Sequence, residues 1–262
     1  MRIVVCVKQV PATTDAKIDP ETKRIVREGT KAVLNPFDLY AVEEALRIRE
    51  RCGGEVVALS MGPGNAKNVL VEALSMGADR AVLVSDRRIA GSDTLVTARI
   101  LAAAVRRLPA PDLILCGKKS IDSETGHVGP QLSVLLSLPL ATNVLSFELT
   151  EERVELLRAG DRGQRLYTGP LPCVLTVCNG NEMVRQPSIL GLRRARSAEI
   201  TRLSLDELGI APEDAGLDGS PTRTVLMEKL RFRSVCGRRV ADPYLGAPEL
   251  AALLGVREEA AL

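Results

Sequence analysis

The sequence is poor in aromatic residues and histidine. Its 262 residues include no tryptophan, three tyrosines, three phenylalanines and one histidine, His127. Surfaces that stack nucleic-acid bases need exposed aromatic rings, so base stacking is disfavoured. A single histidine cannot build a histidine-rich zinc site, and it leaves Ser-His or Cys-His chemistry with one candidate base. These shortages argue against nucleic-acid binding and most hydrolase mechanisms.

Charge of one sign, paired cysteines and long apolar runs are also missing. The 35 Lys and Arg residues nearly balance the 33 Asp and Glu residues, which disfavours a general polyanion binder. None of the six cysteines forms a C-x-x-C motif, and we expect all of them to be reduced core residues. No export signal or membrane-spanning run is visible, so we expect a cytoplasmic protein without membrane insertion. The cysteines are Cys6, Cys52, Cys116, Cys173, Cys178 and Cys236.

Buried strand patterns alternate with helical patterns through the first half. Apolar, β-branched runs are typical of strands that are covered on both faces, and segments of helical period lie between them. The alternation predicts an α/β fold: a parallel, doubly wound, Rossmann-like sheet with helices on both faces. Ligands of such sheets bind beyond the carboxyl ends of the strands. The predicted strands are 3–7, 56–60, 81–84 and 113–116.

The second half has a different pattern. Runs at 154–157, 165–167 and 173–178 are separated by glycine-containing turns and predict small antiparallel strands. Residues 18–25 predict a hairpin excursion, and 187–196 a short basic helix. We divide the chain into an α/β domain, residues 1–195, and an extended C-terminal arm, residues 196–262.

Two phosphate-binding motifs are present in the sequence only in part. Gly62-Pro63-Gly64 starts a dinucleotide fingerprint, but Lys67 replaces its last glycine. Gly117-Lys-Lys-Ser120 is similar to the end of a phosphate loop, but Asp112 stands where the first glycine belongs. An ATPase or a standard Rossmann dehydrogenase is therefore unsupported. No set of nucleophile, base and orienting group emerges, and no metal site.

The segment 117–131 is the most informative one, because it joins a predicted buried strand to a helix. Its small and hydroxyl residues allow close backbone approach, and the helix start offers free N–H groups to a diphosphate. An ordinary polar loop explains the segment equally well. His127 could donate to a ligand or simply be solvated. Asp122 and Glu124 could form an acid-base pair or serve as caps and exposed carboxylates.

Two predicted helix starts have the same ambiguity. Ser92 is the expected N-cap of a helix that contains Asp93, Thr94 and Thr97, and these polar groups could instead face a nucleotide. Residues 35–38, Asn-Pro-Phe-Asp, are both a competent helix start and a candidate adenine contact. The pattern does not separate the two alternatives.

Several segments together resemble the β-subunit of an electron transfer flavoprotein, and the loop is similar to that of the electron-bifurcating type. They are Ile3–Pro11, Asn35–Asp38, Ala41–Ala45, Leu59–Pro63, Ala73–Arg80, Gly117–Pro130 and Pro187–Ile189. The resemblance implies an adenine-nucleotide-binding α/β domain that pairs with an α-subunit carrying the electron-transferring FAD. It also implies that the C-terminal arm packs on the α-subunit.

The resemblance implies a cofactor in this subunit: FAD in bifurcating members, or a structural AMP. The Val128-Gly-Pro130 ending, Gly91–Thr97 and Asp38 favour FAD. His127, Ser123-Glu124 and Ala12 depart from the usual family pattern. The implied cofactor-binding residues are Cys6, Asn35, Pro36, Phe37, Asp38, Ser60, Met61, Gly62, Asp93, Thr94, Thr97, Asp122, Ser123, Glu124, Thr125, Gly126, His127, Val128, Gly129, Pro130 and Gln131.

The function implied by the resemblance is electron bifurcation. With the α-subunit, the chain would take electrons from NADH and pass them to a dehydrogenase or quinone-side acceptor and to a low-potential carrier such as ferredoxin. The alternatives are a non-bifurcating carrier with structural AMP, and an adenine-nucleotide-sensing or hydrolysing protein. The segment implied to dock an acyl-CoA dehydrogenase or another flavin or iron-sulfur oxidoreductase could also be a solvated helix end. Its residues are Gln186, Pro187, Ile189, Leu190, Arg193, Arg194 and Arg196.

Overall fold

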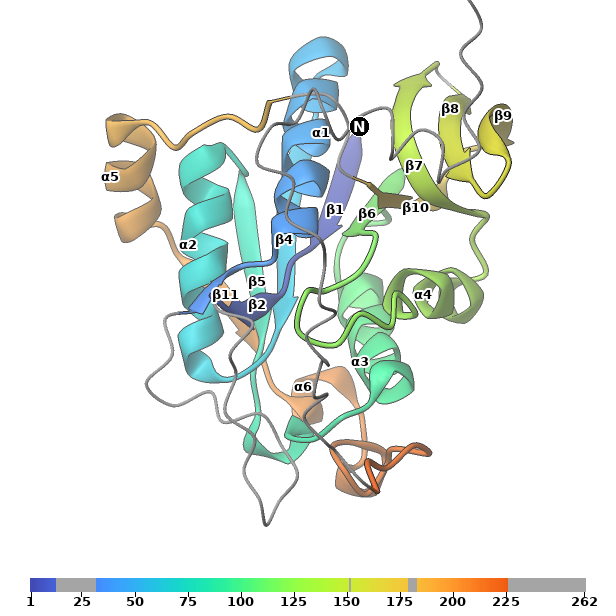
Figure 1. Ribbon diagram of the computed structural model, residues 1–262. Helices are drawn as coiled ribbons and strands as arrows, with labels where there is room; N and C mark the ends of the chain where they lie inside the picture. Colours follow the sequence, from blue (N-terminus) through green and yellow to red (C-terminus); the bar gives the residue numbers. More distant parts are fainter. Residues whose placement is uncertain (13–31, 151, 179–182, 226–262) are drawn as a thin grey trace, which may run out of the picture. The chain divides into compact units, whose positions relative to one another are not determined.

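A computed structural model describes residues 1–12, 32–150, 152–178 and 183–225 (Figure 1). Met1–Val225 forms one compact unit. Its main sheet has nine strands in the order β11-β5-β4-β1-β6-β10-β7-β8-β9, and the first seven run parallel to one another. The strands are β1 (Arg2–Cys6), β4 (Glu55–Met61), β5 (Arg80–Val84), β6 (Leu113–Gly117), β7 (Leu140–Leu149), β8 (Arg153–Gly160), β9 (Gly163–Pro170), β10 (Cys173–Val177) and β11 (Ile200–Leu203).

Helices cover both faces of this sheet, as the sequence predicts. Alternate residues of β1 point to opposite sides, so Ile3 and Val5 join one core cluster, whereas Val4 and Cys6 join the other. The first core contains the buried faces of α1 (Pro36–Cys52) and α2 (Lys67–Met76). The second contains those of α3 (Thr94–Arg107), α4 (Val128–Leu136) and α6 (Leu205–Leu208). The doubly wound α/β prediction is confirmed.

Burial of the central strands stabilises the sheet. Leu113, Ile114 and Leu115 of β6 are all 0% exposed. Burying one such side chain contributes roughly 1.5–3 kcal/mol before entropy is subtracted, which explains why the central strands are apolar on both faces. Short 3-10 helices complete the connections: η1 (Gly64–Ala66), η2 (Arg87–Ile89) and η3 (Pro212–Asp214).

One strand assignment was wrong. The run 173–178 was expected to be antiparallel, but β10 lies between β6 and β7 and is parallel to both. All five of its residues are buried, which is the pattern of a central strand. The sequence prediction grouped it with the neighbouring turn-rich hairpins. The antiparallel pairing of β8 with β9 is confirmed, and β7 was not predicted.

A second, two-stranded antiparallel sheet joins β2 (Gln9–Pro11) to β3 (Ala32–Leu34), directly after β1. The hairpin expected at residues 18–25 lies outside the described residues. The predicted basic helix is present as α5 (Ile189–Ser197), which packs on α2 (Figure 1). Beyond it, β11 extends the main sheet beside β5, and Ser204 caps α6 with Glu207. The arm's packing on an α-subunit remains a prediction.

The cysteine prediction was partly wrong. Cys6, Cys116, Cys173 and Cys178 are buried and free, but Cys52 is exposed at the end of α1. Cys236 lies outside the described residues. Among the helices of the described ranges, none has the length and apolarity needed to cross a membrane.

Candidate functional site

The loops that follow β1 and β6 lie next to each other at the carboxyl edge of the sheet. Cys6, at the end of β1, is in register with Cys116 of β6. The chain leaves β1 toward α1 on one face of the sheet, and it leaves β6 toward α4 on the other. This reversal is a topological switch point, where ligands of doubly wound sheets bind.

Asn35 and Asp38, at the start of α1, hold the loop that follows β6. The Asn35 amide donates to the Lys119 carbonyl at 2.9 Å, and its Oδ1 accepts from the Ile121 N–H at 3.2 Å. One Asp38 oxygen accepts from the Gly117 N–H at 3.1 Å, and the other from the Lys8 N–H at 2.7 Å. Two predicted cofactor residues therefore fix the position of the loop by hydrogen bonds.

Asp38 is a buried carboxyl group with an unusual titration. Burial raises its pKa from 3.8 to about 7, although hydrogen bonds from Asn35, Lys8 and Gly117 act in the opposite direction. A side-chain atom at Gly117 would lie 2.3 Å from Asp38 Oδ1, so only glycine permits this contact. The site thus contains a group that changes charge near neutral pH.

Lys8 was not predicted as a site residue, but it lies inside the network. Its Nζ is 2.6 Å from an Asp122 oxygen and 3.3 Å from Ser120 Oγ. The Asp122 side chain is 4% exposed and pairs with Lys8, whose own side chain is 40% exposed, so for Asp122 the acid-base and exposed-carboxylate alternatives both give way to a partly buried ion pair. The only signal in the sequence was the position of Lys8 directly after a strand.

The middle of the loop is polar and tightly turned. Glu124 and Gly126 have φ values of 55° and 66°, the left-handed region that glycine adopts most readily. Glu124 pairs with Lys119 at 2.8 Å, and Lys119 Nζ lies 6.0 Å from the centre of the Phe37 ring. Ser123 Oγ is 2.8 Å from Ser120 Oγ. The loop therefore holds itself in a defined shape.

The amino end of α4 is uncapped. His127, which is exposed, occupies the N-cap position without a side-chain hydrogen bond to the helix. Within the described residues no acceptor is recorded for the N–H groups of Val128 and Gly129, and Pro130 has none. One turn on, Gln131 Oε1 is buried without a partner in that same set, although its amide donates to Thr94 Oγ1 at 3.3 Å. Free donors and a positive dipole end favour an anion here.

The start of α3 differs from the prediction. The N-cap is Asp93 rather than Ser92: Asp93 accepts from the Val96 N–H at 3.0 Å, while Ser92 Oγ donates to the Ile89 carbonyl. The second Asp93 oxygen accepts from both the N–H and the hydroxyl of Thr222. Asp93 is thus occupied within the chain, whereas the neighbouring Thr94 hydroxyl accepts a hydrogen bond from Gln131 of α4.

Other predicted cofactor residues lie along the same sheet edge. Ser60 is fully buried at the end of β4, and its Oγ has no partner among the described residues. Met61 pairs with Val84, and the Gly62 N–H donates to the Val84 carbonyl. Thr97 is one turn into α3, and no recorded bond of the described chain joins it to the loop.

Two buried cysteines, Cys6 and Cys116, lie side by side at the switch point. A hydrogen bond to Cys6 and burial both raise the pKa of the Cys116 thiol, which therefore stays protonated. They pack as small apolar side chains in the α3–α4 core.

The predicted docking residues are apart from the loop, on and before α5. Ile189 and Leu190 are 86% and 77% exposed, and of the α5 residues only Ala195 is buried. A surface hollow of about 460 Å³ is lined by Ile189, Leu192, Arg193, Arg196 and Ser197. A further cavity of about 1040 Å³ lies at the opposite, amino edge of the sheet, and none of the predicted site residues lines it.

The fold and the switch-point loops define a doubly wound, Rossmann-like α/β protein. The electron transfer flavoprotein domain family matches residues 22–208. The chain belongs to the electron transfer flavoprotein family, and its resemblance to the β-subunit is confirmed. It is an electron-transfer subunit, and a β-subunit implies an α-subunit partner.

Three relatives illustrate the similarity. Electron transfer flavoprotein subunit beta of Thermoanaerobacterium thermosaccharolyticum is 41% identical over 226 residues, which cover 86% of each chain. Caffeyl-CoA reductase-Etf complex subunit CarD of Acetobacterium woodii is 40% identical and covers 85% of this chain and 86% of its own. Protein FixA of Azorhizobium caulinodans is 39% identical and covers 85% and 82%.

Proposed function

We propose that this subunit binds FAD at the loop between β6 and α4 and takes part in electron bifurcation together with the α-subunit. The observation that carries the proposal is the uncapped amino end of α4. Two backbone N–H groups there have no recorded acceptor in the described chain, and the positive end of the helix dipole favours the pyrophosphate of a dinucleotide.

The surrounding residues fit such a cofactor. The left-handed turn at Gly126 lets the backbone approach phosphate closely, and the buried Gln131 Oε1 offers an acceptor to a hydroxyl or amino group of the ligand. Lys118 adds a positive charge to the loop, whereas the charge of Lys119 is paired with Glu124. Asn35 and Asp38 hold the loop in place beside the Phe37 ring, at the segment proposed to contact adenine.

When bound, FAD would accept a hydride from NADH and pass the two electrons on one at a time. The chain's own residues would bind the cofactor and balance its charge. The amino end of α4 would face the negative pyrophosphate, and the ion pair between Lys8 and Asp122 holds the loop to the segment that follows β1. The acceptors proposed are a dehydrogenase or quinone-side oxidoreductase and a low-potential carrier such as ferredoxin. The similarity to CarD and FixA supports this function, since their sequences are 40% and 39% identical to this chain over more than four fifths of their length.

We also propose that α5 docks a partner oxidoreductase, with an acyl-CoA dehydrogenase as the favoured partner. Two exposed apolar side chains, Ile189 and Leu190, stand beside Arg193, Arg194 and Arg196. This combination fits an apolar socket with an acidic rim, because buried aliphatic anchors supply affinity and rim charges steer the encounter.

The cofactor released from the purified α–β heterodimer tests the proposal. Acid precipitation followed by chromatography should yield two FAD per heterodimer, and NADH should bleach the flavin absorbance. Release of one FAD and one AMP would refute bifurcation and support the alternative, a non-bifurcating carrier that binds a structural AMP. Release of ATP-derived nucleotide without flavin would favour a sensor or hydrolase, and absence of a second adenine nucleotide would refute the site.

A further inference from the structure

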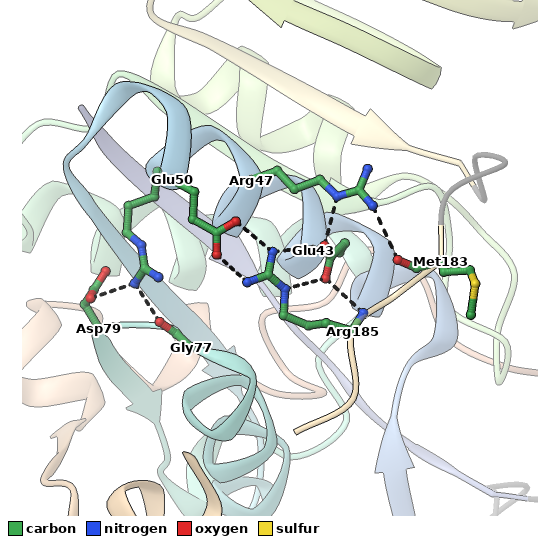
Figure 2. A network of polar contacts seen from close by, with 8 residues as sticks. Glu43, Arg47, Glu50, Gly77, Asp79, Met183 and Arg185 are labelled. Atoms are coloured by element: carbon green, nitrogen blue, oxygen red, sulfur yellow. Dashed lines mark hydrogen bonds and ion pairs between the residues drawn. The ribbon is translucent and has the colours of Figure 1, made fainter. Parts of the chain in front are cut away.

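Arg185 lies four residues before α5 and is bound by two carboxylates of α1 (Figure 2). Its Nε and backbone N–H both donate to Glu43 Oε2, at 2.8 and 3.0 Å, and its Nη2 donates to Glu43 Oε1 at 3.1 Å. Its two terminal nitrogens also donate to the two oxygens of Glu50. One guanidinium group thus bridges two acidic side chains that are two helical turns apart.

The part of this bridge between Arg185 and Glu43 is strengthened by the burial of Glu43. The Glu43 side chain is 5% exposed. Burial alone would raise the pKa of Glu43, but hydrogen bonds from the side chain and backbone of Arg185 and from Arg47 outweigh it, so the pKa is lowered. A planar, five-donor guanidinium group can make paired hydrogen bonds to both carboxylates at once, whereas a lysine ammonium has only three donors on one atom. The bridge therefore depends on arginine and not on charge alone.

The α1 helix that provides both carboxylates is itself anchored. Arg49 donates to the Gly77 carbonyl at 2.7 Å and to Asp79 at 2.8 Å, which connects α1 to the end of α2. Gly77 and Asp79 are labelled in Figure 2. Arg47 donates to Glu43 and to the Met183 carbonyl. The segment before α5 is therefore bound to a rigid element at Met183 and again at Arg185.

Apart from the segment that precedes it, α5 is held by packing on α2 and by β11, which begins at Ile200 and pairs with β5. It is nine residues long, and isolated helices of this length are marginal in water. It crosses α2 at Gly191, where an added Cβ would lie 2.3 Å from the Ser75 carbonyl, and it buries only Ala195. The packing on α2 and the β11 strand hold the middle and the carboxyl end of α5. The segment that leads into the helix holds its amino end, where Ile189 and Leu190 lie.

We propose that Arg185 is a positioning residue for partner docking: by bridging Glu43 and Glu50, it orients α5 so that Ile189 and Leu190 are presented in one arrangement before a partner binds. This inference rests on the docking role of α5 proposed above. Ordering the surface in advance removes an entropic cost from binding, so loss of the bridge should weaken docking without altering electron transfer inside the complex.

The test compares R185Q, R185K and R51Q in the α–β heterodimer. R51Q is the matched control, since it removes the same charge and an ion pair, with Glu148, from the same region of α1. Hydrogen exchange of the peptide 189–197 should be about tenfold faster in R185Q and unchanged in R51Q. The KM for a purified acyl-CoA dehydrogenase should rise about tenfold in R185Q with kcat within twofold, and R185K should lie between R185Q and wild type.

Two further variants separate the possible failures. E50Q removes only the half-exposed carboxylate and should speed exchange in the same peptide to a smaller extent, which keeps the test available if R185Q fails to fold. The double variant I189A/L190A should raise the same KM. If it does not, the docking role of α5 is refuted, while the exchange result still decides whether Arg185 orients the helix. Unchanged exchange in both R185Q and E50Q, or an R185Q KM equal to wild type when I189A/L190A raises it, overturns the inference.

Discussion

Replacing Asp38 by asparagine should change how the stability of the protein depends on pH. Burial raises the pKa of Asp38 from 3.8 to about 7, so above pH 4 the folded chain retains a proton that the unfolded chain releases. Stability contributed by this proton is present at low pH and is lost as the pH rises toward 7. The full difference between 3.8 and about 7 corresponds to about 4 kcal/mol.

The D38N variant cannot ionise, and this sets the expected result. Asparagine has a single acceptor oxygen, so one of the two bonds from the Lys8 and Gly117 N–H groups is lost, at a cost of about 1–3 kcal/mol at every pH. The difference in the free energy of unfolding between D38N and wild type should nevertheless shift in favour of D38N by about 3 kcal/mol from pH 5 to pH 8. Only the wild type loses stability over this range, because its buried carboxyl must ionise.

Urea unfolding of both proteins at pH 5, 6, 7 and 8 measures this gain. D86N is the control, because hydrogen bonds from Arg88 hold the pKa of Asp86 far below its ordinary value, and its contribution to stability is therefore constant over this range. Direct observation comes from the ¹³C signal of the Asp38 carboxyl, whose midpoint should be near pH 7. Parallel pH profiles of wild type and D38N, or a carboxyl midpoint below pH 5, would refute the assignment.

Substitutions at three further positions test local contacts through thermal or urea unfolding. G191A should lower stability by about 1–3 kcal/mol and loosen α5, because its Cβ would lie 2.3 Å from the Ser75 carbonyl; a stability equal to wild type would exclude that close crossing. D93A should cost about 1–2 kcal/mol, since it removes the α3 cap and the Thr222 bonds, and D93N should recover part of the loss. S204A should cost about 1 kcal/mol by opening the capping box of α6, whereas no loss would show that Glu207 alone suffices.

The main architecture could be predicted because its signals are local. Continuous apolar runs gave β1, β4, β5 and β6, and helical spacing gave the helices between them. The same reasoning failed for β10, since a buried central strand and a hairpin strand of five residues look alike when turns lie nearby. The cap of α3 was misplaced by one residue because Ser92 and Asp93 are both good capping residues.

The candidate site was predictable as a region but not as a network. The rule for strand ends selected the loop after the predicted strand 113–116, and residues 35–38 were singled out separately as a helix start or adenine contact. The structure joins the two segments through Asn35 and Asp38. The partnership of Lys8 with Asp122 depends on residues 114 positions apart in the chain. The same holds for Arg185 and Glu43, which are 142 positions apart. No local pattern in the sequence contains such pairings.

The most direct test of the nucleotide site is the ligand content of G126V measured beside G53V. Both glycines have similar positive φ values, 66° and 70°, so valine imposes comparable backbone strain at each. Only Gly126 lies in the loop proposed to bind phosphate; Gly53 ends α1, where an added Cβ meets nothing within 4 Å. After acid release from purified heterodimers, G53V should yield two adenine nucleotides and G126V only the FAD of the α-subunit. A G126V heterodimer that retains both would contradict the placement of the cofactor at this loop.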